Sequence, residues 1–424
     1  ESKHLSREFL LRELSKIEGV YVPQMYNVTK DQNGFQILEP KHDDVPKLVE
    51  KRTITSLEDW PYPKNQLVPI TEVVHDRLNV EVFRGCTRGC RFCQAGMITR
   101  PVRERSADQV RTMVSDGLRR TGYDQVALTS LSTADYSHIE KAVAAVGNDP
   151  LSCGQTGVSL PSLRVDAFTV GIAATIQGGK RSGLTFAPEA GTWRMRQVIN
   201  KLITEEDLYG AVESAFSQGW RRVKLYFLIG LPTETDEDTL GIADLAKNCV
   251  EIGKRYNKQA SVTVSVGGFV PKPFTPFQWF GQNTIEELQR KINLLKDATS
   301  RSRGVQLKWH DPRATLVEGV LSRGDRSLSA LIEQVWRSGG IFQEWSEHFD
   351  IDRWLSSMED LGLAVEDYAY RHRDKSEPLP WDHLDAGLYK DFLWQEWRDA
   401  LEEVGLEDCR WTPCYDCGAC TGYG

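Results

Sequence analysis

Between about residues 78 and 300, short runs of apolar residues alternate with longer stretches in which apolar residues recur at helical spacing. The short runs predict strands and the stretches between them predict helices. Ser106 with Gln109 marks one helix start as a capping box, and Thr204 and Thr235, each followed by acidic residues, mark two more. The predicted strands are Leu78–Phe83, Gln125–Thr129, Gly157–Pro161, Gly183–Phe186, Arg222–Ile229 and Ser261–Val266.

This succession of strand-then-helix units predicts an α/β fold. Strands joined by helices lie parallel, because such crossovers are right-handed and return to the same edge of the sheet. Six units are too few to close an eight-stranded barrel, so the pattern favours a partial (β/α)6 barrel. Chemistry in such folds lies at the carboxyl ends of the strands.

The flanking segments have different patterns, and we expect four parts in all. Residues 1–77 are rich in proline and charge and predict an irregular lead-in or linker before the barrel of residues 78–300. Residues 301–400 predict a helical region rich in tryptophan, and residues 401–424 form a cysteine-rich tail.

Composition excludes several classes of protein. The 424 residues are 40% hydrophobic and 26% charged, which is typical of a globular protein rather than a disordered chain. No apolar run is long enough to cross a membrane, and no apolar signal region opens the sequence, so we expect a cytoplasmic protein without membrane contact. A net charge of −8 argues against coating a nucleic acid by bulk electrostatics.

Three of the nine cysteines, Cys86, Cys90 and Cys93, lie directly after the first predicted strand. Their C-x3-C-x2-C spacing supplies three thiolates, which can hold three irons of a [4Fe–4S] cluster and leave the fourth iron open for chemistry. Zinc is the alternative, but it requires a fourth protein ligand, and the nearest histidine, His75, precedes the strand.

On these cysteines, with Phe92 before the last of them, the sequence resembles the radical S-adenosylmethionine superfamily over residues 78–300. The resemblance implies an enzyme in which the open iron chelates S-adenosylmethionine. One electron from a reducing donor of the flavodoxin or ferredoxin type then cleaves the cofactor to a 5′-deoxyadenosyl radical, which functionalises an unreactive C–H bond. No catalytic side chain beyond the cluster ligands is assigned.

The resemblance also implies which residues contact S-adenosylmethionine, all at predicted strand ends. Ser130 and Ser132 take by position the role of the amine-binding motif, although the common Gly-Gly-Glu form is absent. Arg164 could pair with the methionine carboxylate, because a guanidinium suits bidentate carboxylate binding. In the alternative interpretation it is an ordinary surface arginine. The full set is Ser130, Ser132, Ser162, Arg164, Glu189, Leu231, Val270 and Pro271.

More narrowly, the sequence resembles an uncharacterised group of radical enzymes that usually carry a cobalamin-binding domain before the barrel. Residues 18–23 look like the linker that follows this domain. The Asp-x-His-x-x-Gly signature of cobalamin binding is absent from the sequence. Cobalamin, and with it methyl transfer, is therefore implied by the resemblance alone.

A second group of cysteines, Cys409, Cys414, Cys417 and Cys420, supplies four thiolates within the tail. Four thiolates can close a tetrahedral zinc site or ligate every iron of a second [4Fe–4S] cluster. The C-x2-C-x2-C run favours the iron–sulfur cluster, because zinc sites usually separate two C-x2-C pairs by a longer loop.

The substrate is left open by the sequence. Six arginines around the first cysteines could hold an anionic substrate such as RNA, or they could balance the cluster and solvate its loop. Tryptophans of the tail region could stack on a base or pack the core. A different class of function, a non-catalytic iron–sulfur or electron-transfer module, remains the alternative to an enzyme. The six arginines are Arg84, Arg88, Arg91, Arg100, Arg103 and Arg105.

Overall fold

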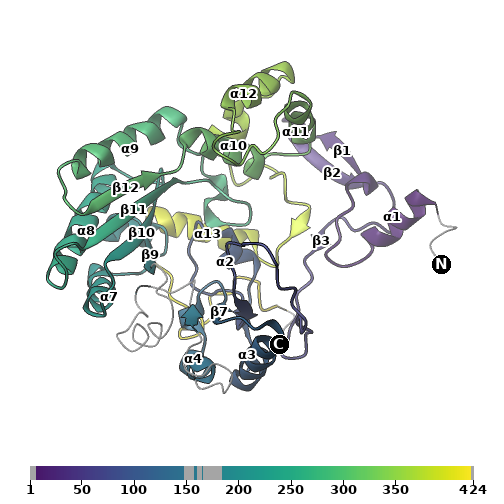
Figure 1. Ribbon diagram of the computed structural model, residues 1–424. Coiled ribbons are helices and arrows are strands. Elements are labelled where there is room, and N and C mark those ends of the chain that lie inside the picture. Colours follow the sequence, from purple (N-terminus) through teal and green to yellow (C-terminus); the bar gives the residue numbers. More distant parts are fainter. Residues whose placement is uncertain (1–5, 148–156, 160–164, 166–183, 422–424) are drawn as a thin grey trace.

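The computed structural model describes residues 6–147, 157–159, 165 and 184–421. Its centre is built from parallel strands in two sheets, ordered β4-β7-β8 and β12-β11-β10-β9 (Figure 1). This is the predicted α/β partial barrel. The strands are β4 (Leu78–Glu81), β7 (Gln125–Thr129), β8 (Gly157–Ser159), β9 (Leu184–Glu189), β10 (Arg222–Ile229), β11 (Ser261–Gly268) and β12 (Val305–Trp309).

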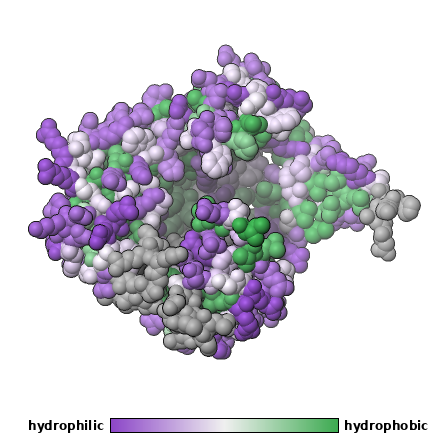
Figure 2. Space-filling view, viewed as in Figure 1, coloured by the Kyte–Doolittle hydropathy of each residue, from purple (hydrophilic) through white to green (hydrophobic). Residues whose placement is uncertain are grey.

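Alternate residues of the larger sheet point to opposite sides, and one side forms the main core. In β10, Val223, Leu225 and Phe227 are buried, whereas the side chains between them are partly exposed. The buried side meets the outer helices of the left half of Figure 1. Figure 2 shows a hollow at the centre of the molecule, with apolar surface along its wall. The outer helices are α7 (Glu205–Ser217), α8 (Asp236–Lys254) and α9 (Ile285–Thr299).

Two of the three expected helix starts have the predicted capping geometry. Thr204 and Thr235 form complete capping boxes with Asp207 and Asp238. Ser106 does cap α3 (Ala107–Thr121), but the reciprocal bond expected from Gln109 is made by Glu58 instead, whose carboxylate accepts the Ser106 backbone N–H at 2.9 Å. Glu58 comes from the lead-in, and a local sequence pattern cannot show a partner this far along the chain.

The parallel sheet has one strand more than the six predicted. β12 pairs with β11 from Val262–Val305 to Val266–Trp309, so the barrel continues past residue 300. Three of its five residues are exposed or polar, which is why it lacks a strong apolar run. The region after it is helical as expected, with α10 (Pro312–Arg323), α11 (Leu328–Arg337), α12 (Ile351–Asp360) and α13 (Lys390–Leu401).

The lead-in is more regular than expected. It contains α1 (Arg7–Ser15) and a hairpin of β1 (Tyr26–Lys30) and β2 (Gln36–Pro40), whose turn includes Gly34 at φ 86°. Gly34 supplies the left-handed residue that a short hairpin loop of this kind needs. Strand β3 (Val49–Glu50) pairs with β13 (Leu384–Asp385), so the lead-in is joined to the C-terminal region.

The prediction that tryptophans of the C-terminal region pack the core is only partly right. Trp354 and Trp381 are buried, but Trp336, Trp345 and Trp411 are more than half exposed. No helix in the described part of the chain is both long and apolar enough to cross a bilayer.

Candidate functional site

The three cysteines of the first group lie on one tight loop after β5 (Phe83–Arg84). Cys93 caps α2 (Gln94–Ile98), and its Sγ accepts the Gly96 N–H at 3.3 Å. A Cβ atom placed on Gly96 would stand 3.4 Å from Cys93 Sγ and 3.8 Å from Cys86 Cβ. Gly96 is thus the small residue beside which these two side chains meet.

Two glycines allow this loop to turn. Gly85 and Gly89 have φ values of 96° and 72°, which side chains other than glycine rarely adopt. A Cβ on Gly85 would stand 2.3 Å from the Pro101 carbonyl oxygen, and one on Gly89 would stand 2.8 Å from Asn200 Nδ2. At Gly85 the backbone of Pro101 leaves no room for a larger residue, and at Gly89 the Asn200 side chain would have to move.

The thiols of this loop are free and lie close enough to influence one another. Burial raises the pKa of Cys86, and it raises the pKa of Cys93 to about 11; the neighbouring Cys90 adds to both shifts. No three His, Cys, Asp or Glu side chains of the described residues stand in closed ligand geometry. The donors themselves fit an iron–sulfur cluster, because thiols grouped on a tight loop are its usual ligands.

The loops after β9, β10 and β11 meet the cysteine loop at the carboxyl ends of the strands. Phe92 packs against a buried cluster that includes Ala190, Leu231 and Phe269. Each of these three residues follows a different strand. Gln94 of α2 adds a hydrogen bond to the Pro273 carbonyl at 3.2 Å, which joins the loop after β11 to the cysteine loop.

The comparisons with known proteins agree with this geometry. Residues 80–246 match the family model described as the radical SAM superfamily. The uncharacterised protein MJ0966 of Methanocaldococcus jannaschii is 31% identical over 357 residues, which are 82% of this chain and 74% of that protein. The chain belongs to the radical SAM superfamily. A [4Fe–4S] cluster, S-adenosylmethionine and a reductant are therefore part of its chemistry.

Solved structures of radical SAM proteins show a more distant likeness. The cobalamin-bound methyltransferase TsrM from Kitasatospora setae is 14% identical, with 67% of this chain and 61% of that chain covered and a TM-score of 0.39. The hydrogenase maturase HydG from Carboxydothermus hydrogenoformans is 14% identical, with 82% and 80% covered and a TM-score of 0.32. At such TM-scores the likeness says nothing about the reaction.

The hydroxyls of the two serines expected near the methionine end of the radical SAM site donate hydrogen bonds within their own loop. Ser130 Oγ donates to Thr133 Oγ1 at 3.0 Å, and the buried Ser132 donates to Asp135 at 2.5 Å. Asp135 in turn forms an ion pair with Arg88 of the cysteine loop. The loop after β7 is thereby joined to the cysteine loop. Ser162 and Arg164 lie outside the described residues.

Glu189 ends β9 in a left-handed conformation with φ 69°, which a residue with a side chain adopts only when its surroundings hold it there. Its side chain is 17% exposed, and Lys201 Nζ lies 3.6 Å from its Oε1. Burial raises the pKa of Glu189, and Lys201 offsets part of that shift. Val270 and Pro271, after β11, are buried at the same edge of the sheet.

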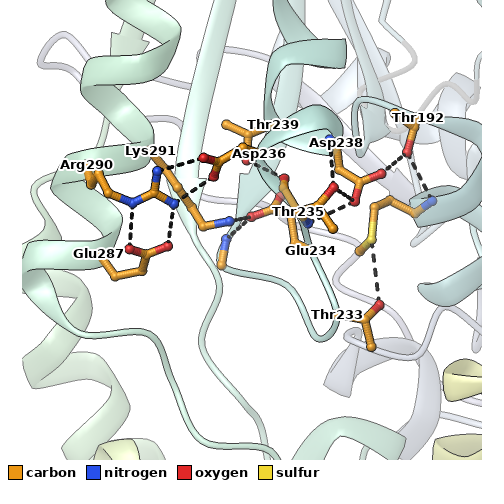
Figure 3. A network of polar contacts seen from close by, with 12 residues as sticks. Thr192, Thr233, Glu234, Thr235, Asp236, Asp238, Thr239, Glu287, Arg290 and Lys291 are labelled. Carbon is orange, nitrogen blue, oxygen red and sulfur yellow. Dashed lines mark hydrogen bonds and ion pairs between the residues drawn. The ribbon is translucent and has the colours of Figure 1, made fainter.

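A buried polar network braces the β10–α8 loop that carries Leu231 (Figure 3). The Glu234 carboxylate accepts the Gly230 N–H at 2.6 Å and pairs with Lys291 at 2.7 Å, and both side chains are almost fully buried. Burial raises the pKa of Glu234, while Lys291 and the Gly230 N–H lower it. Asp238, held by Thr192 and Arg194, anchors the other side of the loop.

The arginines around the first cysteines are turned toward internal partners. Arg91 is fully buried and pairs with Glu396 of α13 at 3.0 Å. Arg84 pairs with Glu81, and Arg103 and Arg105 donate to backbone carbonyls of the lead-in. Arg91, Arg103 and Arg105 therefore hold the cysteine loop to neighbouring segments more than they solvate it.

The C-terminal tail lies directly against the cysteine loop, which the sequence did not predict. Thr87 Oγ1 donates to Asp408 at 2.6 Å, and Tyr415 OH donates to the Thr87 carbonyl at 3.4 Å. Asn200 bridges the two segments, because its Nδ2 donates to the carbonyls of Arg88 at 3.1 Å and Leu406 at 2.9 Å. These contacts place the second group of cysteines beside the first loop.

Arg100 lies between the two groups of cysteines. Its side chain is buried, its Nε donates to the Cys86 carbonyl at 3.3 Å, and its guanidinium stacks near the rings of Phe392 and Tyr415. Nη1 and Nη2 have no hydrogen-bond partner among the described residues. Burial lowers the pKa of Arg100, but the nearby Tyr415 and Cys417 side chains more than offset this.

Proposed function

We propose that this radical SAM enzyme cleaves S-adenosylmethionine reductively at a [4Fe–4S] cluster held by Cys86, Cys90 and Cys93. The cleavage serves to functionalise an unreactive C–H bond of its substrate. The observation that supports this most is the position of the three free thiols, on a loop at the carboxyl ends of parallel strands and in contact with the loops after β9, β10 and β11. The cluster, when bound, supplies the electron that breaks a carbon–sulfur bond of the cofactor.

In this proposal the strand-end residues hold the cofactor and exclude water. Ser130 and Ser132 shape the loop beside the methionine amine, while Glu189 and its partner Lys201 present fixed charges there. Backbone groups of Leu231, Val270 and Pro271 face the adenine, and the Glu234–Lys291 pair holds the loop that carries Leu231. Arg164 pairs with the methionine carboxylate in the same scheme, and Ser162 is a further cofactor contact.

In this proposal Cys86, Cys90 and Cys93 would hold the cluster, and a reducing donor of the flavodoxin or ferredoxin type would supply its electron. With S-adenosylmethionine bound there, the two cofactors would supply the radical chemistry that removes a hydrogen atom from the substrate. The protein's part is to bring the C–H bond close to the cofactor and to keep water away.

Anaerobic spectroscopy with the purified chain tests this proposal. The reconstituted, reduced protein should show an electron paramagnetic resonance signal that shifts when S-adenosylmethionine is added, and it should release 5′-deoxyadenosine. An unchanged signal and no cleavage product would favour the non-catalytic electron-transfer module. Release of S-adenosylhomocysteine, increased by added cobalamin, would identify the cobalamin-dependent methyl transfer that the resemblance implies.

We further propose that Cys409, Cys414, Cys417 and Cys420 hold a second iron–sulfur cluster. Cys417 is buried, and Cys417, Cys409 and Cys414 all lie close enough to Cys420 to add to its raised pKa, after burial. The two unpartnered nitrogens of Arg100 lie on this side of the loop. A buried cation without a counterion is costly, and an anionic metal–thiolate centre supplies one.

The metal at the tail can be identified in a variant that lacks the first site. With Cys86, Cys90 and Cys93 all changed to Ala, any metal retained belongs to the tail. We expect iron and acid-labile sulfide in this variant, measured by metal analysis. Bound zinc without iron would contradict a second iron–sulfur cluster and would support the zinc alternative.

In the same background, Arg100→Met should make the tail cluster harder to reduce. Loss of a buried positive charge destabilises the reduced, more anionic state, so the midpoint potential should fall by tens of millivolts, on the order expected for a charge in a low-dielectric site. A redox titration followed by electron paramagnetic resonance measures this. Arg84→Met, which removes a partly exposed arginine paired with Glu81, is the matched control and should leave the potential unchanged.

A further inference from the structure

A pocket of about 670 Å³ lies away from the cysteines, between the N-terminal hairpin and the segment that follows α12. Lys30 and Gly34 of the hairpin form one side of it. The other side is formed by the end of α10 and by the chain from Gly362 to Pro380. Four basic residues face it: Lys30, Arg323, Arg371 and Arg373.

Two of these arginines are buried at the pocket. Arg323 is 0% exposed and Arg373 is 6% exposed. Arg323 donates to the carbonyls of Ala369 and Arg371, and Arg373 donates to the Arg323 carbonyl at 2.6 Å. The two guanidinium groups thus hold each other's chain segments together, but neither forms a hydrogen bond to a carboxylate.

Several of their nitrogens have no partner. Arg323 Nε, Arg373 Nε and Arg373 Nη1 are buried and make no hydrogen bond within the described part of the chain. Each such nitrogen is a donor that has lost its water without a replacement. A group that binds in this pocket and accepts hydrogen bonds would satisfy them.

The acidic residues at the pocket do not neutralise this charge. Glu377 is held by Arg371 through both carboxylate oxygens, at 2.5 and 2.7 Å, and its nearest approach to Arg373 is 4.0 Å. Asp325 accepts the backbone N–H and the hydroxyl of Ser327. Asp367 is exposed at the rim. The two buried cations therefore have only a long ion pair between Arg373 and Glu377, a carboxylate that Arg371 already binds through both oxygens.

The electrostatic consequence is consistent with this arrangement. Burial, and then the charge of the other arginines, lowers the pKa of Arg323 to about 9 and that of Arg373 to about 10. Both groups still carry their proton at neutral pH. Buried charges without a counterion are unfavourable, so an anion bound in this pocket should stabilise the folded protein.

We propose that this pocket binds the phosphate group of a small phosphate ester, with Arg323 and Arg373 as its buried ligands and Lys30 at its entrance. Guanidinium groups match the geometry of phosphate oxygens, and several donors converge here on one place. The volume of about 670 Å³ is that of a site for a small molecule. The inference does not depend on the cysteines or on radical chemistry.

Binding is tested with the full, anaerobically reconstituted chain, with inorganic phosphate and adenosine monophosphate as probes. At ionic strength held constant with chloride, both should raise the melting temperature in a saturable manner, because a ligand of the folded state stabilises it. Calorimetric titration should show adenosine monophosphate binding more tightly than a short RNA without a terminal phosphate. Tighter binding of that RNA would overturn the assignment to a small ester.

Variants locate the site. Arg373→Met should weaken phosphate binding by about tenfold, the loss expected for a charge-assisted contact, and Lys30→Met, on the exposed strand β1, should weaken it several-fold without disturbing the fold. Arg337→Met removes an exposed arginine of α11 that pairs with Glu333 and should leave binding unchanged. Equal phosphate affinity in the native chain, Lys30→Met and Arg373→Met would overturn the proposal. If Arg373→Met fails to fold, Lys30→Met alone decides it.

Discussion

Cys90→Ala is expected to abolish the cleavage of S-adenosylmethionine. Cys90 lies between Cys86 and Cys93 on the loop, and its thiol influences both of the others. Two remaining thiolates cannot hold three irons of a cubane, so the iron that binds the cofactor would be lost with the cluster. Chromatographic measurement of 5′-deoxyadenosine should show a decrease of at least about a thousandfold, the scale on which loss of a metal centre acts.

Two further cysteine variants make this result specific. Cys249→Ala changes a fully buried thiol of α8 that belongs to the main core and should leave cleavage nearly unaltered. Cys417→Ala removes a ligand of the tail and should reduce cleavage without eliminating it, because the first group of thiols stays intact. Full cleavage by Cys90→Ala, with a normal cluster spectrum, would show that the first site is assigned to the wrong residues.

The strands that carry the site were predictable because their signal is local. Each of β7, β10 and β11 is a short segment rich in apolar and β-branched residues and bounded by turns. The cysteine loop was predictable for the same reason, since three thiols and two glycines within eleven residues specify both the ligands and the turn. The exception among the strands is β12. It is an edge strand with mostly exposed residues, so its sequence has no apolar run to predict it.

What could not be predicted is the set of contacts between distant segments. Asn200 joins Arg88 to Leu406, and Thr87 meets Asp408 across 321 residues of sequence. A single asparagine or threonine has no periodicity or spacing that indicates its partner. The tail is brought to the cysteine loop by such contacts, so its position depends on tertiary packing and not on any local pattern.

The arginines show why composition misleads at this site. Six basic residues around a cysteine loop suggest a surface for an anion, but several of them are bound by carbonyls and carboxylates of the protein itself. Meanwhile the buried Arg323 and Arg373, which local sequence does not set apart, are the pair with unpartnered nitrogens at a pocket. Charge in a sequence gives no information on which guanidinium groups are already satisfied.

Arg91→Met is expected to destabilise the fold more than any other single arginine variant of the cysteine loop. Arg91 is fully buried and pairs with Glu396, and it also donates to the carbonyls of Gln197, Val198 and Val404. The variant leaves the Glu396 carboxylate buried without its partner. Removing one member of a buried pair costs about 3–5 kcal/mol, which anaerobic unfolding in urea would measure as a shift of the midpoint.

The pH dependence and a second substitution separate this electrostatic cost from lost packing. Burial raises the pKa of Glu396 above its ordinary 4.5, and without Arg91, which lowers it, the pKa rises further. A buried acid whose pKa is higher in the folded than in the unfolded state makes the protein less stable as the pH rises between those two pKa values. The loss of unfolding free energy caused by Arg91→Met should therefore shrink as the pH is lowered from about 7 to about 5. Glu396→Leu added to Arg91→Met should recover part of the loss at pH 7, because it removes the unpaired charge. A deficit that neither acid nor Glu396→Leu reduces would mean that the carbonyl contacts of Arg91, and not its ion pair, hold the cysteine loop against α13.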